Sequence, residues 1–120
     1  MQTKRIQRLA GILKAEISQI IHSRLKDPRV GFVTISRVML SSDLKLAKVY
    51  FTLLGDAGKA KENEEALNRA SSFIQSELGS RIRVRYMPAL RFYFDETWEY
   101  EENIERLLHE LHTKQDSSET

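Results

Sequence analysis

Apolar and polar positions alternate with the period of a helix at the start of the chain. Apolar side chains recur every three or four residues over residues 3–22, which predicts a helix with one buried stripe. The stripe consists of Ile6, Leu9, Leu13, Ile17, Ile20 and Ile21. We expect the helix to end before Pro28, because a proline displaces the residue before it from the α region.

The period then changes to two. Residues 32–40 and 44–54 are rich in β-branched and apolar residues, and these alternate with polar ones. The Ser-Ser-Asp sequence at 41–43 favours a turn, so the two segments are expected to form an antiparallel hairpin. The parity of the apolar positions changes near Ser36 and Arg37, which predicts a β-bulge. Residues 55–58, which include two glycines, are expected to form a loop.

Helical spacing returns over residues 62–78. Leu67, Ala70, Ile74 and Leu78 form the apolar stripe. Serine hydroxyls compete for backbone hydrogen bonds, so the pattern allows either an unbroken helix or one that is kinked at Ala70, Ser71 and Ser72. We expect the helix to continue to about Arg83, although the alternation over residues 81–86 is also compatible with a strand.

A last strand follows Pro88, with apolar residues at every second position from Leu90 to Phe94. The connection from the second strand is too long for a hairpin, which predicts a right-handed crossover to a parallel strand. The second strand then lies at the centre of a three-stranded mixed sheet. The helices cover one face of this sheet, and Lys48, Tyr50, Arg91 and Tyr93 point to the other.

The order helix, strand, strand, kinked helix, strand is that of a type II KH-like domain of the α+β class. An extra C-terminal helix is predicted from an apolar stripe that begins at Ile104 and continues through Leu107, Leu108 and Leu111. Trp98 is expected to pack where this helix meets the sheet. The KH-like domain thus spans residues 1–112, and residues 113–120, which include no apolar side chain, are expected to be a disordered tail.

Composition adds limits to this picture. A chain of 120 residues with 41% apolar and 30% charged residues is typical of one globular domain. It contains no run of eighteen apolar residues, so we expect no membrane span and no membrane partner. Cysteine is absent, which excludes disulfides, thiolate metal sites and cysteine nucleophiles and fits a cytoplasmic location.

Charge is distributed unevenly along the chain. Residues 1–94 hold seventeen Lys and Arg against eight Asp and Glu, whereas residues 95–120 hold two against nine. A basic body of this kind is typical of proteins that bind a polyanion, because neutralised phosphates release counterions. The alternative is a solvated surface with an incidental excess of cations.

The candidate phosphate-binding residues occur in two segments. Lys4, Arg8 and Lys26 lie with small residues, including Gly11 and Ala15, on the polar face of the first helix, where a nucleic-acid backbone could approach closely. Alternatively, those small residues are only tolerated on a wet face. The full set predicted to bind RNA is Lys4, Arg8, Lys26, Arg29, Arg81, Arg83 and Arg85. Arginines 81, 83 and 85 could instead pair with the acidic C-terminal segment.

No pattern points to catalysis, to a metal or to a cofactor. His109 and His112 are three residues apart, which is not the four-residue spacing of the zinc-binding H-E-x-x-H pattern. The chain also has no glycine-rich phosphate loop and no nucleophile-elbow sequence. We therefore expect a binding protein rather than an enzyme.

Several short motifs in a fixed order resemble the ribosome-binding factor A family, whose members assist assembly of the bacterial small ribosomal subunit. They are Leu25-Lys26-Asp27-Pro28-Arg29-Val30-Gly31, Val33-Thr34, Val38, Leu40-Ser41, Asp43-Leu44, Ala47-Lys48-Val49-Tyr50, Ala70-Ser71, Ile74, Leu78-Gly79, Arg83, Arg85, Pro88, Leu90, Phe92 and Asp95. The resemblance implies a KH-like fold whose kink lies at an Ala-x-Gly sequence. Here Ser72 takes the place of the glycine.

The resemblance also implies a function. It indicates a protein that binds the immature small subunit and its rRNA, supports rRNA maturation and growth in the cold, and catalyses no reaction. We expect the protein to be a monomer. The alternative is a protein-binding module whose acidic C-terminal helix docks a ribosomal protein or an assembly GTPase.

Overall fold

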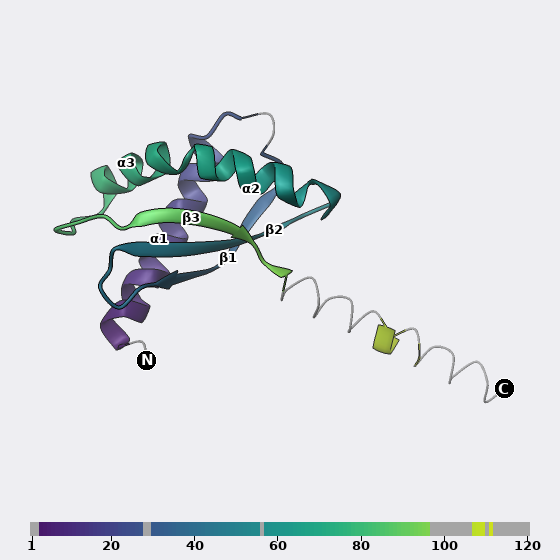
Figure 1. Ribbon diagram of the computed structural model, residues 1–120, viewed down its shortest axis with the longest axis horizontal. Coiled ribbons are helices and arrows are strands. Elements are labelled where there is room, and N and C mark those ends of the chain that lie inside the picture. Colours follow the sequence, from purple (N-terminus) through teal and green to yellow (C-terminus); the bar gives the residue numbers. More distant parts are fainter. Residues whose placement is uncertain (1–2, 28–29, 56, 97–106, 110, 112–120) are drawn as a thin grey trace.

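The computed structural model describes residues 3–27, 30–55, 57–96, 107–109 and 111. Three strands form one layer, and the helices pack on one side of it (Figure 1). The elements are α1 (Lys4–Ser23), β1 (Val33–Leu40), β2 (Leu46–Leu53), the 3₁₀ helix η1 (Ala57–Lys59), α2 (Ala60–Arg69), α3 (Ser71–Arg81) and β3 (Ala89–Phe94). Within the described residues, no helix is long and apolar enough to cross a membrane.

Helix α1 confirms the first predicted element. The hydroxyl of Thr3 accepts a hydrogen bond from the backbone N–H of Ile6 at 3.2 Å and caps the helix N-terminus. The predicted stripe is buried at Leu13, Ile17, Ile20 and Ile21. Ile6 and Leu9 are only partly buried, because this end of α1 lines the groove described below.

The sheet has the predicted topology. Strand β1 pairs antiparallel with β2, and β2 pairs in parallel with β3, so that β2 lies at the centre. The register between β1 and β2 shifts between Ile35 and Arg37, which confirms the bulge. Strand β2 begins at Leu46 rather than at residue 44, because Leu44 belongs to the turn and has a φ of 62°.

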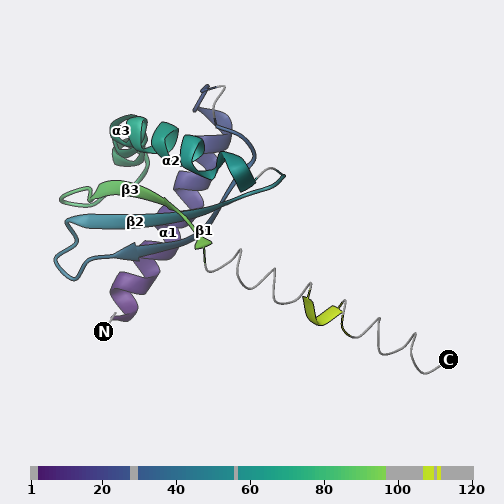
Figure 2. The same ribbon diagram turned by 45° about the vertical axis from the view of Figure 1, so that its right-hand side comes forward.

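The core lies between the sheet and the helices. Phe51 of β2 and Phe92 of β3 are fully buried there against Leu67, Ile74 and other apolar residues of all three helices. Each such side chain contributes about 1.5–3 kcal/mol to the folded state. Among the described residues, no helix covers the opposite face of the sheet (Figures 1 and 2), as the alternation in the strands predicted.

The helix over the sheet is broken at the predicted position, and the unbroken alternative is wrong. Ala70 lies between α2 and α3 with φ −87° and ψ 0°. Its N–H still donates to the carbonyls of Ala66 and Leu67, each at 3.1 Å, so the break is a tight turn of the backbone. Ser72 does not have a positive φ, and a serine in place of glycine is therefore compatible with this kink.

Two further predicted boundaries are wrong. The segment 55–58 was expected to be a loop, but it runs into η1, and α2 begins at Ala60. Helix α3 ends at Arg81 rather than at Arg83, because Ile82 is extended with φ −123° and ψ 130°. Residues 82–88 form neither helix nor strand. Arg83 and Arg85 therefore project from a loop.

Side chains of α2 occupy the outer edge of β3. The Asn68 amide accepts from Phe92 N at 2.8 Å and donates to Phe92 O at 3.0 Å. The Glu64 carboxylate accepts from Phe94 N at 2.9 Å. An edge strand otherwise exposes unpaired polar backbone groups, so these bonds take the place of a fourth strand.

Together, the order of elements and the mixed sheet are those of a type II KH-like domain. Of the predicted C-terminal helix, Leu107, Leu108, His109 and Leu111 have helical backbone and are exposed. Trp98, Ile104 and the predicted tail at 113–120 lie outside the described residues.

Candidate nucleic-acid interface

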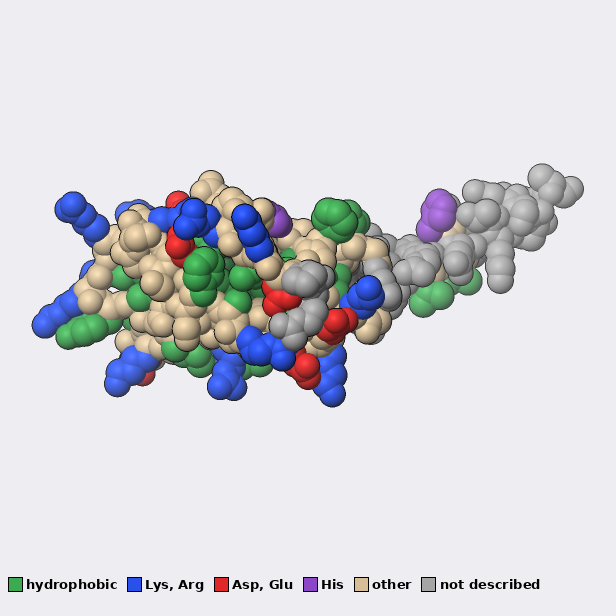
Figure 3. Space-filling view, turned by 90° about the horizontal axis from the view of Figure 1, so that it is seen from above, with side chains coloured by type: hydrophobic (Ala, Val, Ile, Leu, Met, Phe, Trp, Pro, Cys, Tyr) green, Lys and Arg blue, Asp and Glu red, His purple; other side chains and the backbone are tan. Residues whose placement is uncertain are grey.

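A groove of about 1230 Å³ lies at one end of the domain. It is formed by the first turns of α1, the turn between β1 and β2, and the loop between α3 and β3. Because these three segments are far apart in the sequence, only the fold brings them together. Figure 3 shows Lys and Arg side chains projecting at the end of the molecule where the α3–β3 loop lies.

The groove has an apolar floor and a cationic rim. The floor includes Ile6, Leu9, Val84, Met87 and Pro88. The charged side chains that line it are Arg5, Arg8, Lys45, Arg83, Arg85 and Asp43. Five cations against one carboxylate give this end of the molecule a positive potential that attracts phosphates.

Asp43, the one carboxylate among the described residues that line the groove, makes hydrogen bonds within the β1–β2 turn. It accepts a hydrogen bond from the Ser41 hydroxyl at 2.6 Å and another from the backbone N–H of Lys45 at 3.1 Å. The Ser41 hydroxyl is the largest cause that lowers the pKa of Asp43 below its ordinary value. Asp43 therefore helps to fix the position of Lys45 on the rim.

Tyr86 adds an exposed aromatic ring to the groove. Its side chain is 75% exposed, and the Arg85 guanidinium carbon lies 5.5 Å from the centre of its ring. An aromatic ring beside a guanidinium offers both a stacking surface for a base and a charge for a phosphate.

Gln75 of α3 holds the loop in place. Its side-chain amide donates to the carbonyl oxygens of Met87 at 3.1 Å and Pro88 at 3.0 Å. Pro88 is buried, so the loop returns to the sheet at a fixed point. Gln75 thereby orients the segment that carries Arg83 and Arg85.

We expect Gln75→Ala to loosen this loop. Loss of two hydrogen bonds should lower the free energy of unfolding by about 1–2 kcal/mol. Amide hydrogen exchange should accelerate over residues 82–88 and stay unchanged in α1. Gln7→Ala, which truncates an exposed glutamine of α1, is the control. Equal exchange of the loop in both variants would show that Gln75 does not anchor it.

The structure brings together three of the seven cations predicted from the sequence. Arg8, Arg83 and Arg85 all line the groove. Lys4 is exposed one residue before Arg5, at the same end of α1. Lys26 follows the opposite end of α1, roughly 30 Å away along a helix of twenty residues. Arg29 lies outside the described residues.

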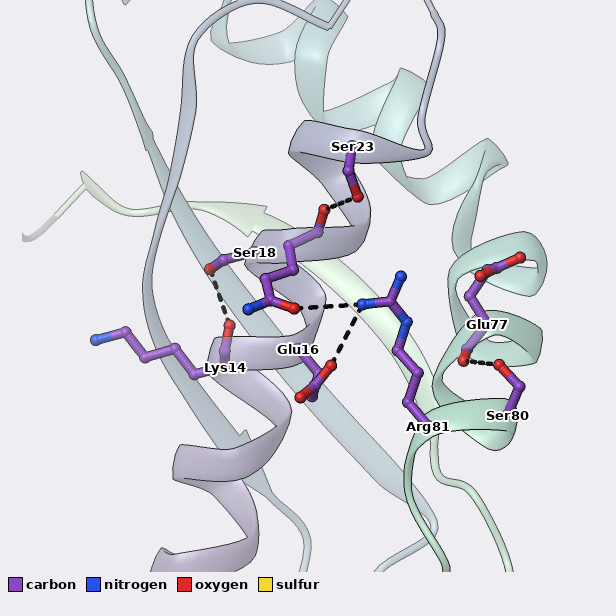
Figure 4. Close-up of polar contacts among 8 residues, drawn as sticks. Lys14, Glu16, Ser18, Ser23, Glu77, Ser80 and Arg81 are labelled. Atoms are coloured by element: carbon purple, nitrogen blue, oxygen red, sulfur yellow. Dashed lines mark hydrogen bonds and ion pairs between the residues drawn. The ribbon is translucent and has the colours of Figure 1, made fainter.

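Arg81 is separated from the other loop arginines. Its guanidinium pairs with Glu16 of α1 at 3.4 Å and with the Gln19 side-chain oxygen at 3.4 Å (Figure 4). The Arg81 side chain is 28% exposed. This arginine therefore links α3 to α1, and its predicted contact with RNA would have to compete with Glu16.

The polar face of α1 is open. Gly11 is exposed, and a Cβ atom at this position would meet no other atom within 4 Å. The small residues therefore leave room for a partner, as the sequence predicted, while Lys4 and Lys26 are too far apart to contact one phosphate. Whether this face binds RNA stays a prediction.

Two cations of the groove were missed from the sequence. Arg5 shares a helix face with Arg8 and Ile12, so the three- and four-residue spacing already contained this signal. The sequence around Lys45 gives no such indication, because this lysine reaches the groove only through the way the β1–β2 turn packs near α1. Among the described residues, no group of three or more His, Cys, Asp or Glu side chains could hold a metal ion.

Comparisons with known proteins agree with this architecture. The family model described as ribosome-binding factor A matches residues 5–108. A ribosome-binding factor A from Staphylococcus carnosus is 44% identical over 114 residues, which cover 95% of this chain and 99% of that protein.

Solved structures are similar over most of the domain. The crystal structure of ribosome-binding factor A from Thermus thermophilus has a TM-score of 0.67 and 29% identity, covering 74% of this chain and 93% of that one. A solution structure from Thermotoga maritima has a TM-score of 0.69 and 35% identity, covering 78% and 89%. A Thermus thermophilus homology model fitted into a map of a 30S–RbfA complex has a TM-score of 0.57 and 31% identity, covering 72% and 90%.

The family model and the Staphylococcus carnosus relative match nearly the whole chain, and the family model includes the loop and most of the helix end that form the groove. The chain belongs to the ribosome-binding factor A family, whose members are non-catalytic, ribosome-binding factors.

Proposed function

We propose that this protein binds the immature small ribosomal subunit through its rRNA, and so supports rRNA maturation and growth in the cold without catalysing a reaction. The observation that carries this proposal is the groove, where five cations surround an apolar floor. A relative of similar fold has been placed in a 30S complex, which supports the same partner here.

The groove suits folded RNA better than a small molecule. Its cations come from three separate segments, so they can contact phosphates of more than one strand or turn of a folded RNA. Phosphate contacts fix the position and orientation of a protein on nucleic acid. The apolar floor and Tyr86 can receive a base that is unstacked from its neighbours.

Docking of a protein partner through the C-terminal segment is the second candidate. Leu107, Leu108 and Leu111 are helical and between 58% and 60% exposed, which is consistent with an amphipathic docking helix. Under this alternative, removal of residues 96–120 abolishes association with the subunit. Under RNA binding through the groove, the shortened chain retains most of its affinity.

A salt series tests the main proposal. Co-sedimentation with small subunits should weaken steeply between 50 and 200 mM salt, because each phosphate contact contributes about 0.7–0.9 to the slope of log K against log salt. Five groove cations predict a slope of roughly −3 to −5. Association that is indifferent to salt would favour a protein partner instead.

A further inference from the structure

The helix-free face of the sheet carries ordered rows of side chains. The strand register aligns Arg37 of β1 with Tyr50 of β2, and Tyr50 with Tyr93 of β3. The next row consists of Met39, Lys48 and Arg91. Successive rows are two residues apart, which is roughly 7 Å along a strand.

The first row is a stacking surface. The rings of Tyr50 and Tyr93 lie with their centres 5.7 Å apart and their planes at 31°. The Arg37 guanidinium covers the Tyr50 ring at 4.1 Å from its centre. Aromatic rings and guanidinium planes are the two surfaces on which proteins stack single-stranded bases.

The second row supplies charge. Lys48 and Arg91 are both exposed and adjacent in register. Asp95, which follows β3, is buried; it accepts a hydrogen bond from the Ser36 hydroxyl at 2.6 Å and lies 3.8 Å from Arg37 Nε. Asp95 therefore holds Arg37 over Tyr50 and leaves Lys48 and Arg91 available for phosphates.

These rows are continuous with the groove. Ala89 lines the groove and pairs in register with Leu46, one row before Lys48 and Arg91. The distance from Ala89 to Tyr93 along β3 is four residues, or about 13 Å. A strand of RNA that leaves the groove could follow β3 across the cationic row to the aromatic row.

We propose that this face is a second RNA-binding surface, which holds a single-stranded segment by stacking bases on Tyr93 and on the Arg37–Tyr50 pair while Lys48 and Arg91 contact its phosphates. The inference rests on the proposed function and extends it. An acidic protein helix fits less well, because the two rows expose one large aliphatic side chain, Met39, at 43%.

Binding of a labelled eight-nucleotide RNA without secondary structure tests the proposal by fluorescence anisotropy. Tyr93→Leu should weaken binding about tenfold, since stacking on an aromatic ring is lost. Tyr93→Phe keeps the ring and should bind within about twofold of the original chain. Phe73→Leu, which removes an exposed ring from α3 on the helical side, is the matched control and should have no effect.

Amide chemical shifts locate the oligonucleotide directly. We expect shifts in β2 and β3 around Tyr50 and Tyr93. Unchanged affinity of Tyr93→Leu, or shifts confined to the helices, would overturn the proposal. Equal loss of affinity for a polyglutamate peptide would assign the face to an acidic protein segment and also overturn it.

Failure of this inference differs from failure of the proposed function. The groove variant Arg83→Gln/Arg85→Gln should lose affinity for whole subunits whatever happens at the sheet. If Tyr93→Leu has no effect and the groove variant still weakens subunit binding, only the second surface is wrong. If the groove variant binds subunits normally, the groove is not the surface that binds the subunit, and that part of the proposed function is wrong.

Discussion

We expect Arg83→Glu/Arg85→Glu to lower the affinity of the protein for small ribosomal subunits by more than about 100-fold at moderate salt. Each arginine supplies one charge-assisted contact, which is typically worth about 1.5–3 kcal/mol, and each glutamate adds repulsion from phosphate. Both side chains project from the α3–β3 loop into the groove, so the fold should be unaffected. Co-sedimentation across a salt series measures the loss, together with a flatter salt dependence.

Lys59→Glu/Lys61→Glu is the matched control for this variant. These lysines are exposed at the start of α2, beyond the far end of β2, and the double change alters net charge by the same amount. We expect only a small loss, due to the weaker overall field. Equal losses in the two variants would mean that total charge, and not the groove, determines binding.

Asn68→Ala should be strongly destabilising, although Asn68 is only partly buried. The Asn68 side chain makes two hydrogen bonds to Phe92 and a third to the carbonyl of Glu64 at 3.0 Å. Its removal leaves the backbone N–H and C=O of an edge strand without these partners, beside a fully buried Phe92 ring. We expect the free energy of unfolding to fall by about 2–4 kcal/mol in a urea titration.

Two further variants test whether the hydrogen bonds of the Asn68 side chain cause this loss of stability. Glu65→Ala on the exposed side of α2 should change stability by less than about 0.5 kcal/mol. Asn68→Asp keeps the acceptor for Phe92 N but places a carboxylate oxygen against the carbonyl oxygens of Phe92 and Glu64, so its free energy of unfolding should fall at least as far as that of Asn68→Ala. A change of less than 1 kcal/mol for Asn68→Ala would contradict the role assigned to this amide.

Most of the fold was predictable from periodicity. The stripe of α1, the bulge at Ser36 and the parallel third strand follow from which side chains must be buried. The end of α3 was not predictable in this way. The alternating residues 81–86 are compatible with either a helix or a strand. In the structure they form a loop, and the side-chain amide of Gln75 fixes the end of this loop by donating hydrogen bonds to the carbonyls of Met87 and Pro88.

The candidate interface was predicted only in part. Arg81, Arg83 and Arg85 look equivalent in the sequence, but α3 ends at Arg81, so Arg81 meets Glu16 while the other two enter the groove. Lys45 also lines the groove, and it comes from the turn of the β1–β2 hairpin. Local patterns identified the type of residue that lines the groove, and the tertiary packing decided which of these residues share it.

The contacts of Asn68 and Glu64 with β3 have a consequence for self-association. Strand addition by a second molecule needs a free row of backbone donors and acceptors, and on β3 the α2 side chains already occupy these groups. On the opposite margin, the bulge at Ser36 interrupts the regular spacing that an incoming strand would have to match. We therefore expect the protein to stay monomeric and resistant to fibrillar aggregation at high concentration.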